Sequence, residues 1–564
     1  MRPAPVPPAA LLRAAGLLLA FGSGCYTTEG GTPPPHDIAY FPVGLAVANA
    51  ARHLVVVNSD FDLQYEAGTV AVLDLDAVRG LTPDPCASDA ECGEGRRCDT
   101  APSDENGGVP SRVCVDLEGP YAGLPCGPVP ERPLAERLLF PGRCQNVDFA
   151  RPPVGDSLIV DTVEVGAFAA DVLYRERPPS APPEAPPGRL FVPVRGDATL
   201  HWIDLDEDGR LHCGQGARGG ACDERHRAGA ERDNPRGLRL EPEPFAVAAT
   251  PDGTGLLVTN QTTGVVSLFV NRWSDEDARL EHAIAELPTN PMGVAALPPP
   301  ALLALRAEEY PPGFLVTFRN AAEVHLFRYF SEAVAAPEAA YVAQAAVRPL
   351  TVNASGVDSR GITVDDFERA HAEAACAARS GVPRSCAADE ACLAELSAEQ
   401  RSELEACLSA ASTIPLDVYI ANRSPASLIV GRTRPEPGAL AATETPVFSD
   451  TVPLTQGPSR VLTGSVIVGT AADGSPLYER RVIVVCFDSR KIIVYDPATR
   501  QIDTEITTGR GPHALALDTE HGLLYVGHFT DSYIGVVSLD RRFPATYGTM
   551  LASFGTPSAP RTSQ

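Results

Sequence analysis

Short apolar strands recur along this chain in a repeating three-part pattern. A turn containing small residues or proline leads into an alternating apolar strand. A second apolar strand ends in Asn, Arg, Asp or His, and a third strand follows after another turn. The pattern is plainest in the three copies that begin at Pro42, Phe245 and Pro512.

The repeat returns about seven times between Pro42 and Gln564, with a period of roughly 40 to 50 residues. Short strands at such a period are typical of radially arranged four-stranded blades. The apolar residues are mainly Val, Leu and Ala, as strand cores require. We therefore expect an all-β chain with a seven-bladed β-propeller over residues 37–545, followed by a last outer strand and tail over 546–564.

Two stretches interrupt the repeat. Residues 79–155, within the first blade, are rich in Pro, Gly, Asp and Cys and show no strand or helix periodicity. We expect a Cys-rich loop insertion that disulfides hold in shape. Residues 365–412, within the fifth blade, are rich in Ala, Glu and Arg, and Ser397 to Gln400 has the form of a capping box. We expect a small helical hairpin there, also stapled by disulfides.

Twelve cysteines fall into even-numbered local clusters, which in an exported chain favour disulfides. They lack the paired Cys-x-x-Cys spacing and neighbouring histidine pairs of zinc sites. Cys486 lies apart in an apolar strand, where we expect a buried, inert thiol. The clusters are Cys86, Cys92, Cys98 and Cys114; Cys126 and Cys144; Cys213 and Cys222; and Cys376, Cys386, Cys392 and Cys407.

Four cysteines allow three pairings, so spacing alone leaves the connectivity open. The segment from Cys86 to Cys98 resembles small Cys-rich modules that are common in exported proteins. That resemblance implies alternating partners, with Cys86 bonded to Cys98 and Cys92 bonded to Cys114.

The first 25 residues have the features of an export leader. Arg2 and Arg13 supply positive charge, the apolar run over 11–21 is too short to span a bilayer, and small residues precede Cys25. The Gly-Ser-Gly-Cys end resembles the lipobox of bacterial lipoproteins, although Gly22 stands where an aliphatic residue is usual. The resemblance implies that Cys25 is lipidated; the alternative is an ordinary signal peptide with a chance cysteine.

Residues 26–36 are polar and rich in Pro and Gly, as a tether should be. No later segment has about 20 uninterrupted apolar residues, so a lipid would be the only membrane anchor. We expect the protein at the bacterial outer membrane, facing the periplasm or the cell surface. The net charge of −26 argues against nucleic acid as a partner.

The residues that end the second strands should converge around the central channel. Together they would form a ring of donors and acceptors suited to recognition. The alternative is that they satisfy the backbone groups of turns, as Asn and Asp often do. The residues are Asn58, Arg195, Asn260, Arg319, Asn422, Asp488 and His528.

Asp204, Asp206 and Asp208 alternate before Gly209, as at the opening of a calcium loop. Gln215 stands at the twelfth position, where an EF-hand has Glu, and the flanks read as strands. Ca²⁺ is therefore possible, and the alternative is a polar hairpin turn. We expect no other cofactor.

The repeat resembles surface-layer-type YVTN and NHL-like seven-bladed β-propellers, through residues 54–58, 256–260 and 523–528. The resemblance supports the fold, but propellers host many functions. No Gly-x-Ser-x-Gly elbow, phosphate loop or His-Glu-x-x-His motif occurs, so we assign no catalytic residue.

We expect a lipid-anchored envelope propeller that binds a protein or glycan or serves as a scaffold. One alternative is an exported, metal-dependent, lactonase-like hydrolase, for which Asn260, Asn422 and Asp488 could serve as ligands. The other is a purely structural envelope lipoprotein. The sequence does not decide whether the protein is an enzyme, and it favours one that is not.

Overall fold

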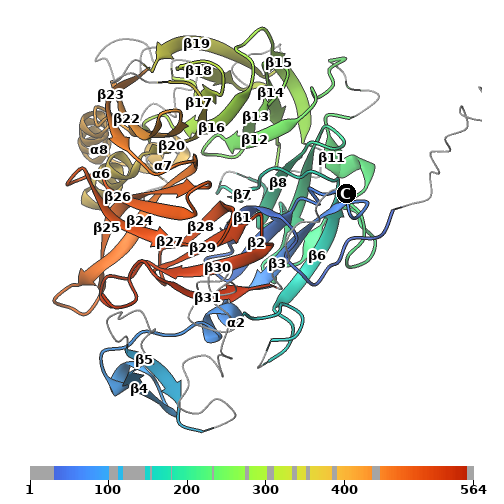
Figure 1. Cartoon of the computed structure of the whole chain (residues 1–564). Helices are drawn as coiled ribbons and strands as arrows, with labels where there is room; N and C mark the ends of the chain where they lie inside the picture. Colours follow the sequence, from blue (N-terminus) through green and yellow to red (C-terminus); the bar gives the residue numbers. More distant parts are fainter. Residues whose placement is uncertain are drawn as a thin grey trace, which may run out of the picture.

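Seven antiparallel sheets form a closed ring, which makes the protein a seven-bladed β-propeller as the repeat predicts (Figure 1). The computed structural model describes residues 31–100, 112–118, 146–152, 155–179, 181–230, 234, 236–273, 278–301, 310–332, 339–350, 356–383, 386, 390–434 and 445–555. The first strands of neighbouring blades contact one another around the ring, and the first blade meets the seventh.

The strands of each blade follow one another along the chain. Blades 1 to 3 consist of β1 (Pro42–Ala48), β2 (His53–Asn58), β3 (Gly68–Asp74) and β6 (Ile159–Val165); β7 (Leu173–Glu176), β8 (Gly188–Val194), β9 (Thr199–Leu205), β10 (Leu211–His212) and β11 (Arg227–Ala228); and β12 (Pro244–Ala249), β13 (Gly255–Asn260), β14 (Val265–Val270) and β15 (Arg279–Ile284). In blade 2, β10 and β11 share the outer edge of β9.

Blades 4 to 7 keep the same order from the inner to the outer strand. They consist of β16 (Pro291–Leu297), β17 (Gly313–Phe318), β18 (Glu323–Phe330) and β19 (Tyr341–Pro349); β20 (Ser359–Asp365), β21 (Asp417–Arg423), β22 (Ala426–Arg434) and β23 (Thr445–Pro453); β24 (Pro458–Thr470), β25 (Pro476–Cys486), β26 (Lys491–Asp496) and β27 (Gln501–Thr507); and β28 (Pro512–Asp518), β29 (Leu523–His528), β30 (Tyr533–Ser538) and β31 (Met550–Phe554).

One apolar cluster fills each of the seven interfaces between neighbouring blades. Strand β2 shows why its sequence is continuously apolar. Leu54 and Val56 pack against blade 7, whereas Val55 and Val57 pack against blade 2. Because successive side chains point to opposite faces and both faces are covered, every position of the strand must be apolar.

A short segment of the first insertion joins the first blade to the last. The Val147 N–H donates to the Ser553 carbonyl at 2.9 Å, and the Gly555 N–H donates to the Val147 carbonyl at 2.7 Å. Val147 thereby forms a parallel bridge with Phe554 at the outer edge of β31. This segment, which we call the clasp, covers an edge that would otherwise be open.

The first insertion contains more regular structure than its sequence predicts. After α2 (Leu75–Gly80) and the 3₁₀ turn η1 (Asp89–Glu91), β4 (Arg96–Thr100) pairs with β5 (Arg112–Asp116). The predicted Cys-rich loop did not include these two strands. They have five residues each, so they carry too short an alternation to be recognised from sequence.

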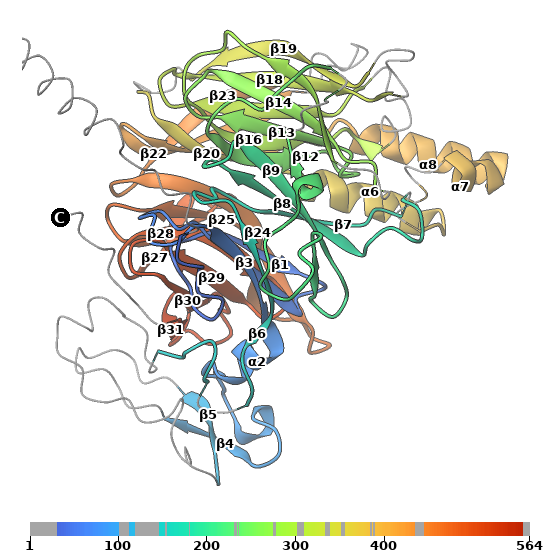
Figure 2. The same cartoon turned by 90° about the vertical axis from the view of Figure 1, so that its right-hand side faces the viewer.

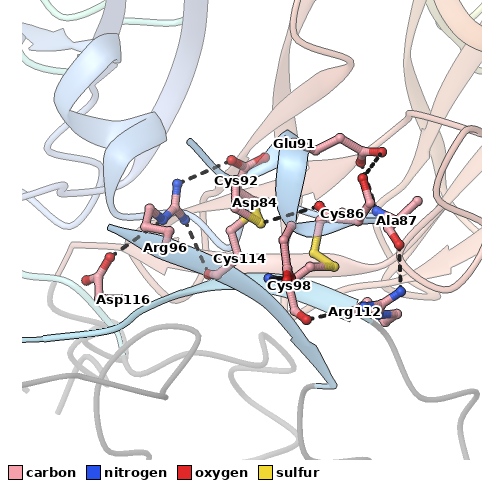
Figure 3. The surroundings of a disulfide bond; sticks show 12 residues. Asp84, Cys86, Ala87, Glu91, Cys92, Arg96, Cys98, Arg112, Cys114 and Asp116 are labelled. Atoms are coloured by element: carbon pink, nitrogen blue, oxygen red, sulfur yellow. Dashed lines mark hydrogen bonds and ion pairs between the residues drawn. A yellow bond between two sulfur atoms is a disulfide. The ribbon is translucent and has the colours of Figure 1, made fainter. Parts of the chain in front are cut away.

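Two disulfides form the core of that insertion (Figure 3). Cys86 bonds to Cys98 and Cys92 bonds to Cys114, which are the partners that the module resemblance implies. Cys98 and Cys114 face each other across β4 and β5, yet each is bonded to a cysteine that precedes the hairpin. Cys126 and Cys144, expected to form a further disulfide, lie outside the described residues.

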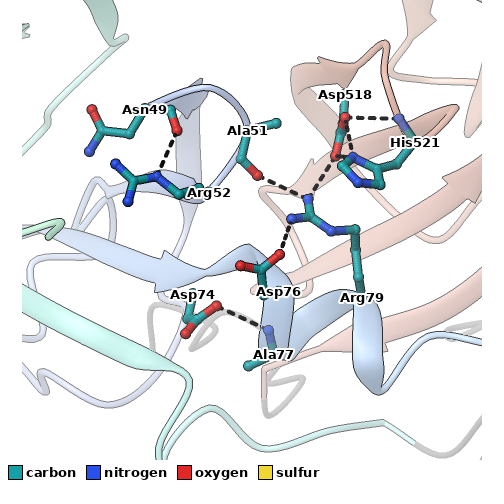
Figure 4. Close-up of polar contacts among 9 residues, drawn as sticks. All are labelled: Asn49, Ala51, Arg52, Asp74, Asp76, Ala77, Arg79, Asp518 and His521. Atoms are coloured by element: carbon teal, nitrogen blue, oxygen red, sulfur yellow. Dashed lines mark hydrogen bonds and ion pairs between the residues drawn. The ribbon is translucent and has the colours of Figure 1, made fainter. Parts of the chain in front are cut away.

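Arg79, at the end of α2, fixes the base of the first insertion to the propeller (Figure 4). Its Nη1 donates to the Ala51 carbonyl at 3.0 Å and to the Asp518 carboxylate at 2.9 Å. Asp518 is fully buried, and its carboxylate also lies 2.9 Å from His521 Nδ1. One guanidinium thus joins α2 to blades 1 and 7.

The second insertion contains α6 (Phe367–Arg379), α7 (Glu390–Glu395) and α8 (Ala398–Ala411). A disulfide between Cys376 and Cys407 staples α6 to α8, as expected, and a second joins Cys386 to Cys392. Ser397 and Gln400 form the predicted capping box. The short α7 is an addition to the predicted hairpin.

The two remaining cysteine predictions concern the blades themselves. Cys213 bonds to Cys222 in the loop after β10, and Cys486 is free and fully buried in β25. Burial raises the pKa of the Cys486 thiol, which keeps it protonated.

The second strands of all blades finish at one end of the channel. Both insertions begin at the opposite end of the channel. Strands β2 and β21 finish at Asn58 and Asn422, and β3 and β20 run away from that end before the insertions start. In Figure 2 the helices α6 to α8 project on one side of the ring. We call the end of the channel near Asn58 and Asn422 the mouth.

Candidate functional site

Three of the residues predicted to form a rim are asparagines that the structure places inside the blades. Asn58, Asn260 and Asn422 are almost completely buried. Each amide oxygen accepts a hydrogen bond and each amide nitrogen donates one. Asn58 bonds to Tyr40 N and Thr69 Oγ1, both at 2.9 Å; Asn260 to Ser267 Oγ at 3.0 Å and the Glu241 carbonyl at 2.6 Å; and Asn422 to Ser359 Oγ at 3.0 Å and the Pro425 carbonyl at 2.9 Å.

His528 is buried in the same way. Its ring stacks on Tyr533 with 4.0 Å between the ring centroids, and its Nε2 contacts the Thr508 hydroxyl. Burial lowers the pKa of His528 to about 3, so the imidazole is neutral at physiological pH. The contacts of these four buried side chains therefore stabilise the strand ends and turns around them.

The three charged members of the predicted rim form ion pairs. Arg195 pairs with Glu243 at 2.9 Å, Arg319 pairs with Asp358 at 3.4 Å, and Asp488 pairs with Arg423. Only Arg195 lines the cavity at the mouth. The structure therefore brings the seven predicted residues to the same end of the ring without forming one continuous polar surface.

The mouth contains a cavity of about 310 Å³ to which all seven blades contribute. This volume is at the lower end of the range for small-molecule sites. Its lining includes four arginines, one carboxylate, one histidine and four phenylalanines. They are Arg195, Arg360, Arg423 and Arg460; Asp171; His513; and Phe61, Phe245, Phe487 and Phe529.

A repeated backbone irregularity directs side chains into this cavity. In six blades the pairing of the first and second strands shifts register one or two residues into the first strand. Such a bulge redirects a side chain. The first residue of each shift lines the cavity, and these residues are Val43, Phe245, Met292, Arg360, Ser459 and His513.

An ion pair crosses the mouth from blade 6 to blade 2. Arg460 Nη1 lies 2.8 Å from Asp171 Oδ1, and its Nη2 lies 3.4 Å from the Ala170 carbonyl. Burial raises the pKa of Asp171, and the Arg460 guanidinium opposes that shift. Each of the four arginines in the lining pairs with a carboxylate: Arg195 with Glu243, Arg360 with Asp358, Arg423 with Asp488 and Arg460 with Asp171. Of these four carboxylates, Asp171 alone belongs to the described lining of the cavity.

His513 stands beside this pair on blade 7. Burial, and secondarily the charge of Arg460, lower the pKa of His513 to about 3. The imidazole is therefore neutral at physiological pH, and its Nδ1 has no hydrogen-bond partner among the described residues. A neutral ring with an unpaired nitrogen can serve a ligand as donor or acceptor.

Aromatic rings form a wall of the cavity at blades 1 and 7. The centroids of Phe61 and Phe529 lie 5.1 Å apart, and those of Phe529 and His513 lie 6.0 Å apart. Phe61 remains 48% exposed, although it is a large apolar side chain. Exposed aromatic surface next to charged groups is typical of recognition sites.

The predicted calcium loop lies at the opposite end of the channel. Asp204 pairs with Arg189 at 2.6 Å, whereas Asp206 accepts the backbone N–H groups of Asp208 and Arg210 in a tight turn. Asp208 is exposed. The three carboxylates do not converge, so Ca²⁺ stays a prediction without geometric support.

Among the described residues, one group of potential metal ligands lies close together, namely Cys86, Cys92 and Cys114. All three belong to disulfides, which accounts for their proximity. In the described part of the chain no helix has the length and apolarity needed to cross a bilayer. Cys25, predicted to be lipidated, lies outside that part.

No protein-family model matches this chain, and no curated protein matches its sequence. Solved propeller structures align with it at low similarity. A putative 6-phosphogluconolactonase from Bacteroides uniformis is 11% identical, with 83% of this chain and 86% of that one covered and a TM-score of 0.39. The periplasmic gluconolactonase of Pseudomonas aeruginosa is 11% identical over 83% and 86%, with a TM-score of 0.38. Virginiamycin B lyase from Staphylococcus aureus is 10% identical over 65% and 85%, with a TM-score of 0.30.

Sequence reasoning missed most of the cavity. It selected the ends of the second strands, whereas the cavity is lined chiefly by the beginnings of the first strands. In six blades a signal was present in the residue that follows Pro or Ser at the start of the first strand, such as Arg360 after Ser359 and His513 after Pro512. Asp171 has no such signal, because it follows Ala170 and lies between the isolated bridge of Ala169 with Val194 and the start of β7.

Proposed function

We propose that this protein is an exported β-propeller that acts as a binding module and takes a group of its ligand into the cavity at the mouth. The single observation that supports this best is that all seven blades contribute side chains to that cavity. A protein or glycan of the cell envelope that presents a group small enough for about 310 Å³ fits the site. The lipoprotein character and the YVTN- or NHL-like character belong to the same proposal.

The hydrolase alternative has weaker support from the cavity. A lactonase-like metal site needs several oxygen ligands directed at one point. The amide groups of Asn260 and Asn422 already form hydrogen bonds at the strand ends, and Asp488 pairs with Arg423. The described lining of the cavity contains one carboxylate, Asp171, and it is already paired with Arg460, so it is not a free metal ligand.

The course of the chain suggests how a lipid at Cys25 would orient the propeller. Residues 31–41 lie on the mouth side, since the Glu66 N–H donates to the Thr32 carbonyl at 3.1 Å and the Phe41 ring contacts Phe61. Only residues 26–30 separate Cys25 from this segment, which is about 20 Å of fully extended chain. In this proposal the mouth faces the membrane and the disulfide-stapled insertions project away from it.

The binding site is tested by filling the cavity. Ser459 lines it at a register shift, so Ser459→Trp should occupy the space and abolish the retention of any ligand that co-purifies with the native protein. Thr499→Trp, in the exposed turn between β26 and β27, is the matched control. Native mass spectrometry compares the three proteins. Equal ligand retention by Ser459→Trp and the native protein would place binding elsewhere.

The anchor is tested separately by fractionating cells. Cys25→Ser should move the mature protein from the membrane fraction to the soluble fraction. A variant that stays with membranes would contradict the lipid anchor without affecting the binding site.

A further inference from the structure

The cavity has a charge opposite to that of the protein. Its lining carries four guanidiniums and one carboxylate, in a chain whose net charge is −26. The carboxylates that pair with the other three arginines, Glu243, Asp358 and Asp488, do not line it. The outer faces of these arginines are thus neutralised, while the cavity itself presents N–H donors. An anion is the complementary ligand.

Two buried polar atoms in the lining lack partners among the described residues. They are Arg195 Nε, which can only donate, and His513 Nδ1, which donates or accepts. An unpaired buried polar group costs free energy, and such groups in native proteins call for an explanation. A ligand with oxygen acceptors would satisfy Arg195 Nε.

The remaining wall is formed by phenylalanines, which offer no hydrogen-bonding group and no charge of their own. Phe61 and Phe529 form an edge-to-face pair beside His513, and Phe245 and Phe487 add apolar surface from blades 3 and 6. Aromatic faces favour another flat apolar group. An inorganic ion would use only the arginine side of the cavity.

The structure also contains a carboxylate in contact with one of these arginines. Asp171 reaches Arg460 across the mouth, with two blades between them in one direction round the ring and three in the other. Burial disfavours its ionised form, as the raised pKa shows. A ligand carboxylate would contact Arg460 in the same way and would compete with Asp171.

We propose that the group bound in the cavity is a carboxylate attached to an apolar ring, with Arg460 binding the carboxylate in competition with Asp171 and with Phe61 and Phe529 contacting the ring. This inference rests on the proposed function and names its ligand chemistry. A small free acid and the C-terminal aromatic residue of a protein share that chemistry.

Phenylacetate is the first probe, and calorimetry measures its affinity for the full chain, with the propeller and both insertions. Acetate lacks the ring, and phenylacetamide lacks the charge at nearly the same shape. We expect phenylacetate to bind at least about tenfold more tightly than either, since acetate loses the contact of the ring and phenylacetamide loses the charge-assisted hydrogen bond to Arg460. The peptide Ala-Ala-Phe distinguishes the two sources, because tighter binding than phenylacetate indicates a protein terminus.

Two variants should shift this affinity in opposite directions. Arg460→Gln should weaken phenylacetate binding about tenfold or more, whereas the isosteric Asp171→Asn should strengthen it by removing the competing carboxylate. Neither change should alter the affinity for phenylacetamide. Arg401→Gln on the surface of α8 is the control and should leave all affinities unchanged.

The outcomes separate this inference from the proposed function. Equal binding of phenylacetate and phenylacetamide, lost in Ser459→Trp, would overturn the carboxylate and keep the cavity as the site. Weaker phenylacetate binding in Asp171→Asn would overturn the competition. If neither phenylacetate nor Ala-Ala-Phe shows saturable binding, the proposed ligand class is wrong. Undiminished binding in Ser459→Trp would overturn both.

Discussion

Arg460 and Asp171, which are 289 residues apart in the chain, form an ion pair at 2.8 Å across the mouth of the channel. Blades 7 and 1 lie on one side of the pair, and blades 3, 4 and 5 lie on the other. Their side chains are 25% and 13% exposed, so solvent screens the pair only in part. The pair therefore links two blades that are not neighbours in the ring.

Removing the two partners should have unequal effects on stability. Arg460→Gln leaves a mostly buried carboxylate without its cation and should lower the free energy of unfolding by about 2–3 kcal/mol. Asp171→Asn removes a carboxylate whose ionisation burial disfavours, so it should change stability by less than about 1 kcal/mol. Urea unfolding at pH 7.5 measures both. Equal losses would contradict this account.

Asp60 predicts a gain in stability on mild acidification. It is 1% exposed at the mouth, its Oδ2 has no partner among the described residues, and burial raises its pKa to about 6. Because the folded state binds a proton on the Asp60 carboxylate more tightly than the unfolded state does, the native protein should gain stability relative to Asp60→Asn as the pH falls from 7.5 to 5. Over this pH range the raised pKa corresponds to a gain of about 1–2 kcal/mol, which denaturant titrations would measure. A pH-independent difference would assign the shift to another group.

His528 predicts the opposite pH dependence. Its folded pKa, about 3, lies below that of an unfolded histidine, so its contribution to stability is present above pH 6.5 and is lost as the pH falls. His528→Gln should therefore flatten the loss of stability between pH 6.5 and 5, although it weakens the protein at pH 7.5 by removing the stack on Tyr533. Thermal melts across this range test the slope. An unchanged slope would assign the acid sensitivity elsewhere.

We expect the backbone hydrogen bond from Val147 in the clasp to Ser553 to stabilise the closure of the ring. Val147→Pro removes the N–H that donates to Ser553 and should cost about 2–3 kcal/mol. Val147→Thr keeps the N–H and is the control. We expect hydrogen exchange to accelerate in β31 in the proline variant while blades 3 and 4 stay protected. Uniform acceleration in all blades would mean that closure and the rest of the ring unfold as one unit.

The disulfide between α6 and α8 should stabilise its insertion and leave the propeller almost unchanged. Replacing both Cys376 and Cys407 by Ser opens a loop of 31 residues, for which loop entropy predicts a loss of about 3–4 kcal/mol. The insertion has its own apolar cluster, so the loss should be local. Limited proteolysis should cleave within 367–411 at an unchanged melting temperature. A lower melting temperature would show that the insertion supports blade 5.

The strands of the blades, their number and the cysteine clusters that form disulfides could be predicted from the sequence. Leu54 to Val57 must be apolar at every position because both faces of β2 are covered, and such a run is visible in one dimension. Ser397 and Gln400, three residues apart, make a cap that depends on local geometry alone. The pairing of the first four insertion cysteines needed a resemblance, because spacing leaves three possibilities open.

Which side chains reach the channel depends on the closed ring and could not be predicted from the sequence. Asn58 and Asn260 end the predicted strands but turn into their own blades, whereas register shifts direct Arg360 and His513 into the cavity. Strand periodicity specifies a strand and its two faces, and a shift of one residue exchanges those faces. The contact between Arg460 and Asp171 depends on closing all seven blades into one ring, which no local pattern contains.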